Sequence, residues 1–313
     1  MTLRSDRSAA RLPPPDFAIV GAPKCGTTAL FSYLASHPGI AMSASKEPLF
    51  WSADIERRGR VADRAAYEAL WAQARPGALR GEASPEYLRS RVAVPALLAA
   101  RPDVRLIAML RNPVDLVASL HSNLVFGALE DVPDLEAAWR LQEDRRRGES
   151  LPRDCNDPVL LQYAEYAALG DQLERLTALV PAAQRLVVLL DDLRADPRAE
   201  YLRVLAFLGL DDDGRRVFDQ VHPNRRVRSP AISGMQRTWG SRLAVVHPAI
   251  RRVAHALGLR PLAMLERLNS PALPRKPMRP EFRAELLAAF APQVEKIERL
   301  LERDLSAWKA PSG

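Results

Sequence analysis

Hydrophobic residues fall into short continuous runs along the first two thirds of the chain, and segments with helical spacing separate these runs. Strands are expected at residues 16–20, 79–83, 104–110 and 185–190. Helices are expected at residues 27–37, 63–74, 113–126, 158–179 and 197–208. Continuous apolar strands that alternate with helices predict an α/β fold, in which a parallel sheet is flanked by helices on both faces.

The C-terminal third has a different pattern, with helical spacing near residues 241–257 and 280–305 and no clear strand. Pro292 should break or kink the second of these helices, because proline lacks an amide hydrogen and its ring clashes with the preceding turn. At the other end, residues 1–15 are mostly polar and finish with three prolines. We therefore expect a flexible tail over residues 1–15 and a single domain over residues 16–313 with a helical C-terminal part.

Composition narrows the class of protein. A chain of 313 residues with 47% hydrophobic and 27% charged residues is typical of a globular domain and not of a disordered one. No run approaches about 18 apolar residues, and no apolar run follows the charged N-terminus, so we expect no membrane span and a cytoplasmic location. Two cysteines, Cys25 and Cys155, exclude a disulfide framework, and no spacing favours a metal site.

The positive charge of the chain comes mostly from arginine. The net charge is +7, and only five of the 45 basic residues are lysines, which leaves forty arginines. Arginine is spread along the whole chain, as expected for a compositional background and not for a nucleic-acid-binding patch. The rare lysines are therefore more informative, and two of them, Lys24 and Lys46, lie near the strongest motif.

That motif is Gly21-Ala22-Pro23-Lys24-Cys25-Gly26-Thr27-Thr28, between the first expected strand and helix. Its glycines keep the P-loop spacing that aims backbone amides and a helix N-terminus at a phosphate. A nucleotide-triphosphate loop needs lysine directly after the second glycine, where this chain has Thr27. Transfer of a sulfuryl group, which carries a single negative charge, fits better: Lys24 would stabilise the leaving phosphate.

The segment GAPKCGTTAL resembles the 5′-phosphosulfate loop of sulfotransferases that use 3′-phosphoadenosine 5′-phosphosulfate (PAPS), above all the heparan-sulfate-type and related bacterial enzymes. Arg111-Asn112-Pro113 followed by Ser119 resembles the 3′-phosphate motif of that family. Weaker matches are KEPLFW at residues 46–51, EASPEY at residues 82–87 and the C-terminal ending. The resemblance covers about residues 16–308, so the expected domain is a sulfotransferase domain.

The resemblance implies an enzyme of the EC 2.8.2 type with PAPS as co-substrate and no metal. The donor-binding residues that it implies are Pro23, Lys24, Cys25, Gly26, Thr27, Thr28, Arg111 and Ser119. Sulfuryl transfer by in-line displacement would go to a hydroxyl, or alternatively an amine, of a carbohydrate, glycolipid or small-molecule acceptor. The acceptor itself and the oligomeric state are left open.

The resemblance also assigns catalytic roles. Lys24 would stabilise the leaving group, and Glu47 would be the general base that removes the acceptor's proton. His37 and His121 are alternatives, because histidine is the base in other branches of the family. Lys46 would meet an anionic acceptor, the transferring group or solvent.

One block departs from the family. Heparan-sulfate enzymes often carry a lysine on the acceptor side where this chain has Ala83, which argues against a glycosaminoglycan acceptor. Asn224 resembles a late asparagine that precedes a basic stretch in the family, and the candidates for closing over the 3′-phosphate are Arg225, Arg228, Arg275 and Lys276.

Two other classes of function are alternatives to sulfuryl transfer. A P-loop kinase or NTPase would hydrolyse ATP with Mg²⁺, but the displaced lysine argues against it. A basic nucleic-acid-binding protein would bind DNA in a salt-dependent manner, but the arginines are not clustered.

Overall fold

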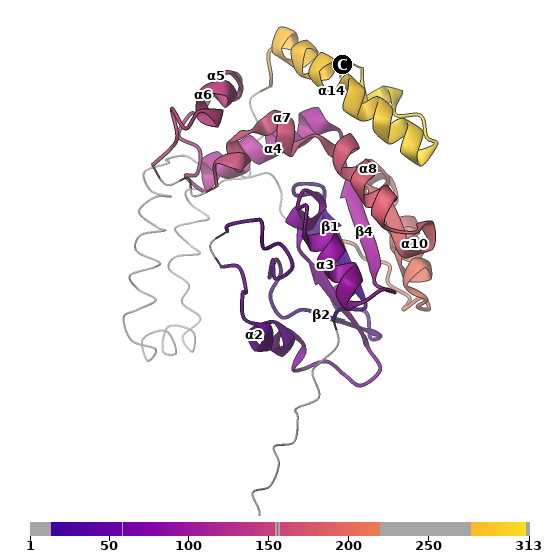
Figure 1. Cartoon of the computed structure of the whole chain (residues 1–313). Helices are drawn as coiled ribbons and strands as arrows, with labels where there is room; N and C mark the ends of the chain where they lie inside the picture. The colour runs from indigo at the N-terminus through magenta and orange to yellow at the C-terminus, as the bar shows by residue number, and fades with distance from the viewer. Residues whose placement is uncertain (1–13, 58, 154, 156, 220–276, 311–313) are drawn as a thin grey trace, which may run out of the picture. The chain divides into compact units, whose positions relative to one another are not determined.

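The computed structural model describes residues 14–57, 59–153, 155, 157–219 and 277–310 (Figure 1). The chain forms two compact units. The first consists of Met1–Asn112, Ala168–Val221 and Pro292–Leu305, and the second of Pro113–Ala167, His222–Ala291 and Ser306–Gly313. Most of the expected tail and the expected helix at 241–257 lie outside the described residues, and the single domain over residues 16–313 stays a prediction.

The first unit contains a five-stranded parallel sheet with the order β2-β3-β1-β4-β5. Its strands are β1 (Phe17–Gly21), β2 (Ile40–Met42), β3 (Leu79–Ala83), β4 (Arg105–Leu110) and β5 (Arg185–Leu189). The four predicted strands are confirmed with shifts of one residue at most. The strand β2 was not predicted, because three residues are too few for a period-2 pattern to be recognised.

Close packing at the centre of the sheet explains the composition of β1 and β3. All five residues of β1 are buried. In the register, Phe17 lies opposite Gly81 on one side and Arg105 on the other. A Cβ atom at Gly81 would lie 2.2 Å from Cζ of Phe17, so only glycine leaves room for that ring.

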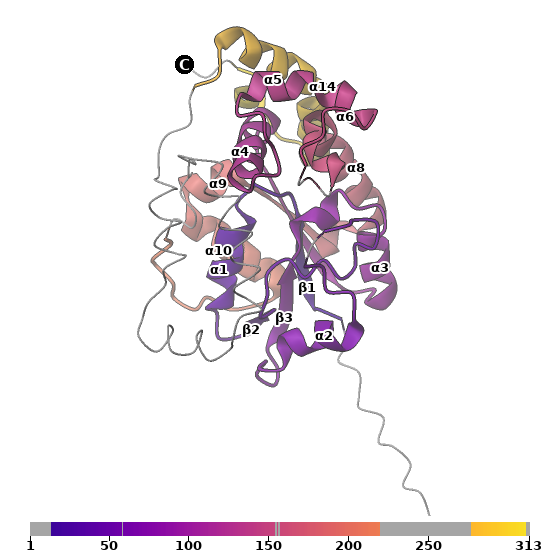
Figure 2. The same ribbon diagram turned by 90° about the vertical axis from the view of Figure 1, so that its left-hand side faces the viewer.

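Helices cover both faces of the sheet, as predicted. Figure 2 shows α1 and α10 on one face and α3 and α8 on the other. The described helices of this unit are α1 (Thr27–Ala35), α2 (Arg64–Glu68), η1 (Ala69–Trp71), η2 (Pro85–Leu88), α3 (Ala93–Ala100), α8 (Leu169–Leu179), η4 (Ala182–Gln184), α9 (Leu190–Ala195), α10 (Pro197–Leu208) and, from Pro292 on, the second half of α14 (Pro280–Leu301). Of these, α10 has clear sequence signals: Asp196 accepts a hydrogen bond from the amide of Ala199, Pro197 begins the helix and Gly209 ends it in the left-handed conformation.

Two of the predicted helices are not continuous over their predicted length. Residues 158–179 form three pieces, η3 (Pro158–Leu161), α7 (Tyr163–Tyr166) and α8, because the backbone leaves the helical region at Gln162 (ψ 72°) and Ala168 (ψ 59°). Residues 63–74 shorten to α2 and the 3₁₀ turn η1.

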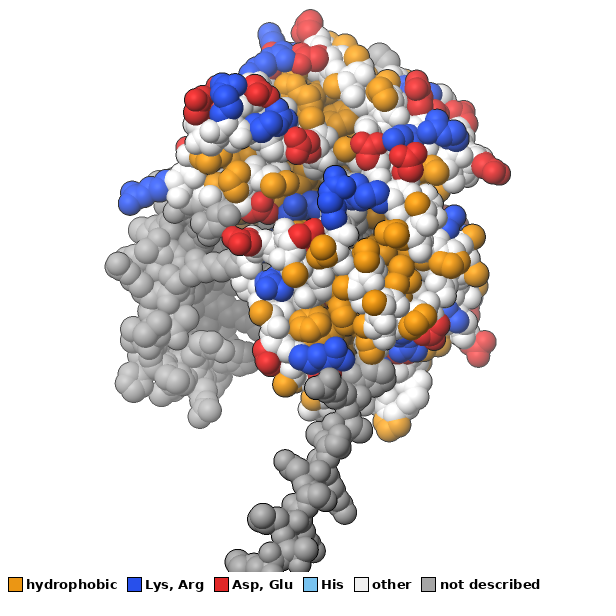
Figure 3. Space-filling model, viewed as in Figure 1, with side chains coloured by type: hydrophobic (Ala, Val, Ile, Leu, Met, Phe, Trp, Pro, Cys, Tyr) orange, Lys and Arg blue, Asp and Glu red, His pale blue; other side chains and the backbone are white. Residues whose placement is uncertain are grey.

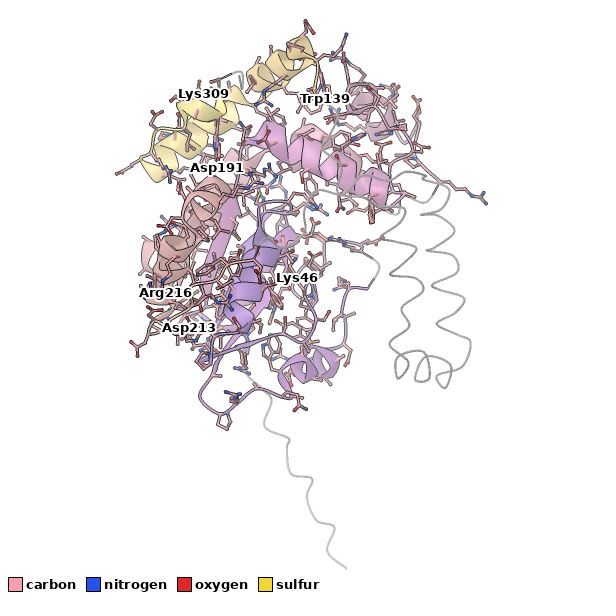
Figure 4. All side chains as sticks on the ribbon, turned by 180° about the vertical axis from the view of Figure 1, so that it is seen from behind. Lys46, Trp139, Asp191, Asp213, Arg216 and Lys309 are labelled. Carbon is pink, nitrogen blue, oxygen red and sulfur yellow. The ribbon has the colours of Figure 1, made fainter. Side chains whose placement is uncertain are left out.

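The second unit is helical within the part of the chain that the structure describes. It contains α4 (Pro113–Phe126), α5 (Leu135–Arg140), α6 (Gln142–Arg146), η3, α7, the first half of α14 (Pro280–Leu301) and η5 (Ser306–Trp308). Trp139 of α5, which is labelled in Figure 4, packs edge-on against Phe282 and Phe290 of α14, with ring centroids 6.4 and 5.9 Å apart.

Pro292 does not break α14, contrary to the first of the two outcomes expected from sequence. The helix runs through it to Leu301. Both Pro292 and Ala288, whose carbonyl loses its usual amide partner, are exposed. Water can therefore bond that carbonyl, which lowers the cost of proline inside the helix.

A buried ion pair holds the second unit together. The guanidinium of Arg145 bonds both carboxylate oxygens of Glu130 at 2.6 and 2.7 Å, and both side chains are fully buried. Glu130 also accepts hydrogen bonds from the hydroxyl of Tyr163 at 2.5 Å and the amide of Val132 at 2.9 Å. Burial raises the pKa of Glu130, but the hydrogen bonds from Arg145 and Tyr163 outweigh it and hold this pKa below its ordinary value.

We expect Glu130→Gln to lower the free energy of unfolding by about 3–5 kcal/mol, because the buried guanidinium of Arg145 loses its buried charged partner and keeps only the exposed Asp131 at 4.0 Å. Urea unfolding at neutral pH measures this loss. Because the pKa of Glu130 is lower in the folded state, its contribution is present above the ordinary carboxylate pKa and disappears as the pH falls. Glu143→Gln, at an exposed ion pair, is the control and should change stability little; an equally small loss in Glu130→Gln would contradict the prediction.

Candidate active site

The predicted phosphate loop lies at the carboxyl end of β1, where ligands of parallel α/β sheets bind. The loop ends at Gly26, which caps α1 with φ 89°, and a Cβ atom there would lie 2.8 Å from Cδ1 of Leu190. Helix α1 begins without a side-chain cap and without an acidic residue in its first turn. Its N-terminus is therefore suited to an anion that accepts hydrogen bonds from backbone amides.

Lys24 and Arg111 meet in this loop. The backbone of Lys24 is in the left-handed region at φ 64°, and its carbonyl accepts a hydrogen bond of 3.1 Å from Nη1 of Arg111. Arg111 directly follows β4 and is 8% exposed. The amide of Ala22 donates to the carbonyl of Met109 in β4 at 2.6 Å. These bonds tie the loop to the end of β4 and bring two of the predicted donor-binding cations together.

The remaining loop residues differ in exposure. Cys25 and Thr27 are buried, whereas Pro23 and Thr28 are partly exposed. The thiol of Cys25 donates to the carbonyl of Pro23 at 3.5 Å. Burial raises the pKa of the Cys25 thiol to about 12, although the nearby charges of Arg111 and Lys24 act in the opposite direction. Cys25 is therefore a thiol at neutral pH and is suited to positioning the loop and not to nucleophilic attack.

We expect iodoacetamide to leave Cys25 unmodified in the folded protein at pH 7–8, because the buried thiol does not ionise in that range. Cys155, which is only partly buried, is the internal control. Mass spectrometry of the labelled peptides should show Cys155 modified first and Cys25 modified only after unfolding in urea. Equal labelling of both cysteines in the native protein would show that the loop exposes its thiol.

Glu47 lies at the carboxyl end of β3, beside β1. Its amide donates to the carbonyl of Ala83 at 2.9 Å, and the amide of Ser43 donates to the carbonyl of Gly81 at 2.8 Å. The segment after β2 therefore continues along β3 and ends in a turn in which Glu47 and Leu49 have positive φ values of 61° and 55°.

Cations surround the carboxylate of Glu47, whose side chain is 31% exposed. Nζ of Lys46, the residue labelled in Figure 4, lies 2.6 Å from Oε1, and Nη1 of Arg57 lies 3.3 Å from Oε2. Burial raises the pKa of Glu47, but the charges of Lys46, Arg57 and Lys24 outweigh this effect and hold it below its ordinary value. Glu47 is therefore ionised at neutral pH, and Lys24 is near enough to act on its charge.

The two histidines considered as alternative bases both have structural hydrogen bonds. Nδ1 of His37 accepts from the amide of Gly39 at 3.0 Å, and its Nε2 lies 3.1 Å from the carbonyl of Asp211. Nε2 of His121 lies 2.9 Å from the carbonyl of Val132, and burial lowers the pKa of this histidine. In each of these imidazole rings, Nε2 is therefore hydrogen-bonded to a backbone carbonyl.

Not every predicted residue is placed at the site. Ser119 lies on α4 in the second unit and is buried. Its role in binding the 3′-phosphate remains a prediction. Asn224, Arg225, Arg228, Arg275 and Lys276 lie outside the described residues.

Two residues of this site, Arg57 and Glu82, were not predicted from the sequence to have a role. Nη1 of Arg57 bonds Oε1 of Glu86 at 3.0 Å as well as lying beside Glu47, but one arginine among forty carries no signal. Glu82, in a block that was recognised without a role, is fully buried and accepts three side-chain hydrogen bonds.

Much of the arginine background is neutralised by ion pairs. Such pairs are Arg140 with Glu285, Arg198 with Asp212, Arg279 with Glu136 and Arg303 with Asp192. On the face drawn in Figure 3, basic and acidic side chains of the described residues are interspersed. Within those residues there is no cluster of three or more metal-ligating side chains, and none of their helices has the length and apolar character needed to cross a bilayer.

A family model for the sulfotransferase domain matches residues 14–226. The chain belongs to the sulfotransferase family. The match begins before β1 and includes the phosphate loop, Glu47, Arg111 and Ser119. Neither the kinase nor the nucleic-acid-binding alternative is favoured by it.

The proteins of known name or structure that this chain resembles are also sulfotransferases. A sulfotransferase structure from Alicyclobacillus acidocaldarius is 28% identical, with a TM-score of 0.69 over 96% of this chain and 100% of that one. Mouse heparan sulfate glucosamine 3-O-sulfotransferase 3B1 is 27% identical over 76% of this chain and 58% of its own. Human heparan sulfate glucosamine 3-O-sulfotransferase 6 is 30% identical over 66% of this chain and 55% of its own. The chain thus matches little more than half the length of these curated relatives.

Proposed function

We propose that this sulfotransferase transfers the sulfuryl group of PAPS to a hydroxyl of a carbohydrate, glycolipid or small-molecule acceptor, with an amine as the alternative. The observation that carries the proposal is the uncapped N-terminus of α1 with Lys24 in its loop and the ionised carboxylate of Glu47 within range of the charge of Lys24. We also propose a cytoplasmic location and no nucleic-acid partner, in line with the composition of the chain.

The donor's 5′-phosphosulfate would bind at the phosphate loop. Backbone amides at the start of α1 and the hydroxyls of Thr27 and Thr28 would bond the phosphate oxygens. Arg111 and Ser119 would bind the 3′-phosphate, and a forked contact from the guanidinium is worth about 1.5–3 kcal/mol. Pro23, Cys25 and Gly26 would act through the shape of the loop.

The reaction would be a single in-line displacement. The acceptor oxygen attacks sulfur as the bond between sulfur and the bridging phosphate oxygen breaks, so that one S–O bond forms and one is lost. Glu47 takes the proton of the acceptor hydroxyl. Lys24 stabilises the negative charge that develops on the leaving adenosine 3′,5′-bisphosphate (PAP).

The two cationic side chains next to Glu47 would lie where the acceptor binds. Lys46 and Arg57 are 20% and 40% exposed and would contact an acceptor that carries negative charge near its reacting hydroxyl. Two of the relatives are named for the glycan heparan sulfate, which carries sulfate groups. The alanine at position 83 sets this chain apart from the lysine-containing pattern, so an acceptor other than a glycosaminoglycan remains part of the proposal.

Calorimetry with PAP tests the donor half of the proposal without a known acceptor. We expect one PAP per chain, and binding that is unaffected by EDTA because no group of the loop depends on a metal. Binding of ATP with Mg²⁺ in preference to PAP would favour the NTPase alternative.

A further inference from the structure

Glu82 is a fully buried carboxylate that no step of the proposed reaction uses. It lies near the carboxyl end of β3, one residue before Ala83, whose carbonyl accepts from the amide of Glu47. Three hydroxyl groups donate to it: Tyr67 to Oε1 at 2.5 Å, Ser84 to Oε2 at 3.0 Å and Tyr87 to Oε2 at 3.2 Å.

Each of these hydroxyls also accepts an N–H from the segment that follows Glu47. The hydroxyl of Ser84 accepts from the amide of Leu49 at 3.1 Å, and that of Tyr87 from the amide of Trp51 at 3.3 Å. The hydroxyl of Tyr67 accepts from the indole nitrogen of Trp51 at 2.8 Å. Three hydrogen-bond chains thus run from residues 49–51 to one carboxylate.

The direction of these chains requires the ionised form of Glu82. A hydroxyl that accepts an N–H sends its own hydrogen to the carboxylate, and the ionised form accepts all three without a hydrogen of its own to place. A protonated Glu82 would bring a further hydrogen into a pocket whose facing oxygens already carry one each. Protonation must therefore break or weaken at least one chain.

The backbone that includes Glu47 and Leu49 is in a conformation that its surroundings must stabilise. Glu47 and Leu49 are both in the left-handed region, which residues with side chains rarely adopt and which persists only where the surroundings fix it. The fixed points are the bond from Glu47 to Ala83 on one side and the bonds of Leu49 and Trp51 on the other.

We infer that Glu82 is a positioning residue: its ionised carboxylate, acting through Ser84, Tyr87 and Tyr67, holds residues 49–51 and so fixes the turn that presents Glu47. This inference rests on the proposed role of Glu47 as the base. Glu82 does not itself reach the acceptor or the donor.

The ionisation of Glu82 falls in the neutral range. The groups that face it are the hydroxyls of Tyr67 on α2 and of Ser84 and Tyr87 at and after the end of β3, with the indole of Trp51 behind them. Burial raises the pKa of Glu82 to about 7, against the lowering effect of these hydrogen bonds. The hydrogen-bond chains are therefore complete above neutral pH and weaken as the pH falls through this value.

Amide hydrogen exchange in the full chain tests the inference without any acceptor. In Glu82→Gln, the protection factors of the amides of Leu49 and Trp51 should fall at least about tenfold. In the wild-type protein the same two protection factors should fall between pH 8 and pH 6, and in Glu82→Gln they should not change with pH. Tyr201→Phe, which removes a buried hydroxyl bonded to Asp213 at 3.0 Å, is the matched control and should leave both amides protected. Unchanged protection in Glu82→Gln would overturn the inference.

Tyr87→Phe keeps the test decisive if Glu82→Gln does not fold. It removes only the chain to the amide of Trp51, so protection should be lost at Trp51 and kept at Leu49. Equal protection of Trp51 in the variant and the wild-type protein would equally overturn the inference.

Kinetics separate this inference from the proposed function. With an acceptor found in a screen with labelled PAPS, Glu82→Gln should lower kcat at least about tenfold and leave the Kd for PAP within twofold, because it displaces the base and not the donor loop. Wild-type protein that neither binds PAP nor transfers label would refute the proposed function, while the exchange result would still decide whether Glu82 holds residues 49–51. A normal kcat in Glu82→Gln would refute the positioning role alone.

Discussion

Replacement of Lys24 by alanine is expected to lower kcat for sulfuryl transfer by about 100- to 1000-fold, with a much smaller change in the Kd for PAP. In the proposed reaction the lysine would act on charge that develops on the bridging oxygen as the S–O bond breaks, so its contribution would be greatest in the transition state. Backbone amides at the start of α1 and Arg111 would still bind the phosphates in the variant. Single-turnover kinetics with labelled PAPS and calorimetry with PAP measure the two effects separately.

Lys296→Ala is the matched control for that experiment. Lys296 is another of the five lysines and lies in the same unit, where its ammonium pairs with Asp171 at 2.6 Å and with Glu174 at 2.9 Å. Its removal should leave both kcat and PAP binding unchanged. Full turnover in Lys24→Ala would remove Lys24 from the chemical step, and a parallel loss of rate and PAP binding would make it a donor-binding residue only.

Replacement of Glu47 by glutamine should lower kcat by about 100- to 10,000-fold, the usual contribution of a general base. Glutamine keeps the size of the side chain and its hydrogen bonding but cannot take a proton. Because nearby cations lower the pKa of Glu47, the carboxylate protonates only below its ordinary range, and a loss of activity near neutral pH does not come from Glu47 itself. Initial rates from pH 5 to pH 9 in both proteins measure these effects.

The control for Glu47→Gln is Glu68→Gln, which alters an ion pair with Arg64 on α2. This variant should retain wild-type kcat. If Glu47→Gln keeps more than about a tenth of the wild-type kcat, another group removes the proton.

The sheet was predictable because its signal is local. The runs at β1 and β4 are buried almost throughout and therefore read as continuous apolar stretches. The run at β5 is apolar after Arg185 but only half-buried over its first three residues. Strand β2 has three residues and depends on its pairing with β3, which no local pattern reveals. The helix expected over residues 158–179 also has a sound helical spacing, but the backbone leaves the helical region at Gln162 and Ala168, which the spacing does not reveal. Gly170, two residues later, lies so close to α14 that a Cβ atom would be 2.6 Å from the carbonyl of Gln293.

The candidate site likewise has one part that could be predicted from the sequence and one part that could not. The phosphate loop is contiguous in sequence, so its glycine spacing and the displaced Lys24 could be read directly, and the structure then added its tie to Arg111. The network around Glu82 could not be predicted, because Tyr67 and Tyr87 bond one carboxylate from separate segments and Trp51 connects to it only through the hydroxyl of Tyr67. Its members look like ordinary core residues when they are seen one at a time.

The reaction proposed for this site is the transfer of a sulfuryl group from PAPS. The most direct measurement is transfer of ³⁵S from labelled PAPS to a panel of hydroxyl and amine acceptors in the presence of EDTA, with wild-type protein and Lys24→Ala in parallel. We predict a labelled product and an equal amount of PAP from the wild-type protein, and a rate about 100- to 1000-fold lower in the variant. The account is contradicted if PAPS is neither bound nor consumed, or if the chain instead hydrolyses ATP in a reaction that EDTA stops.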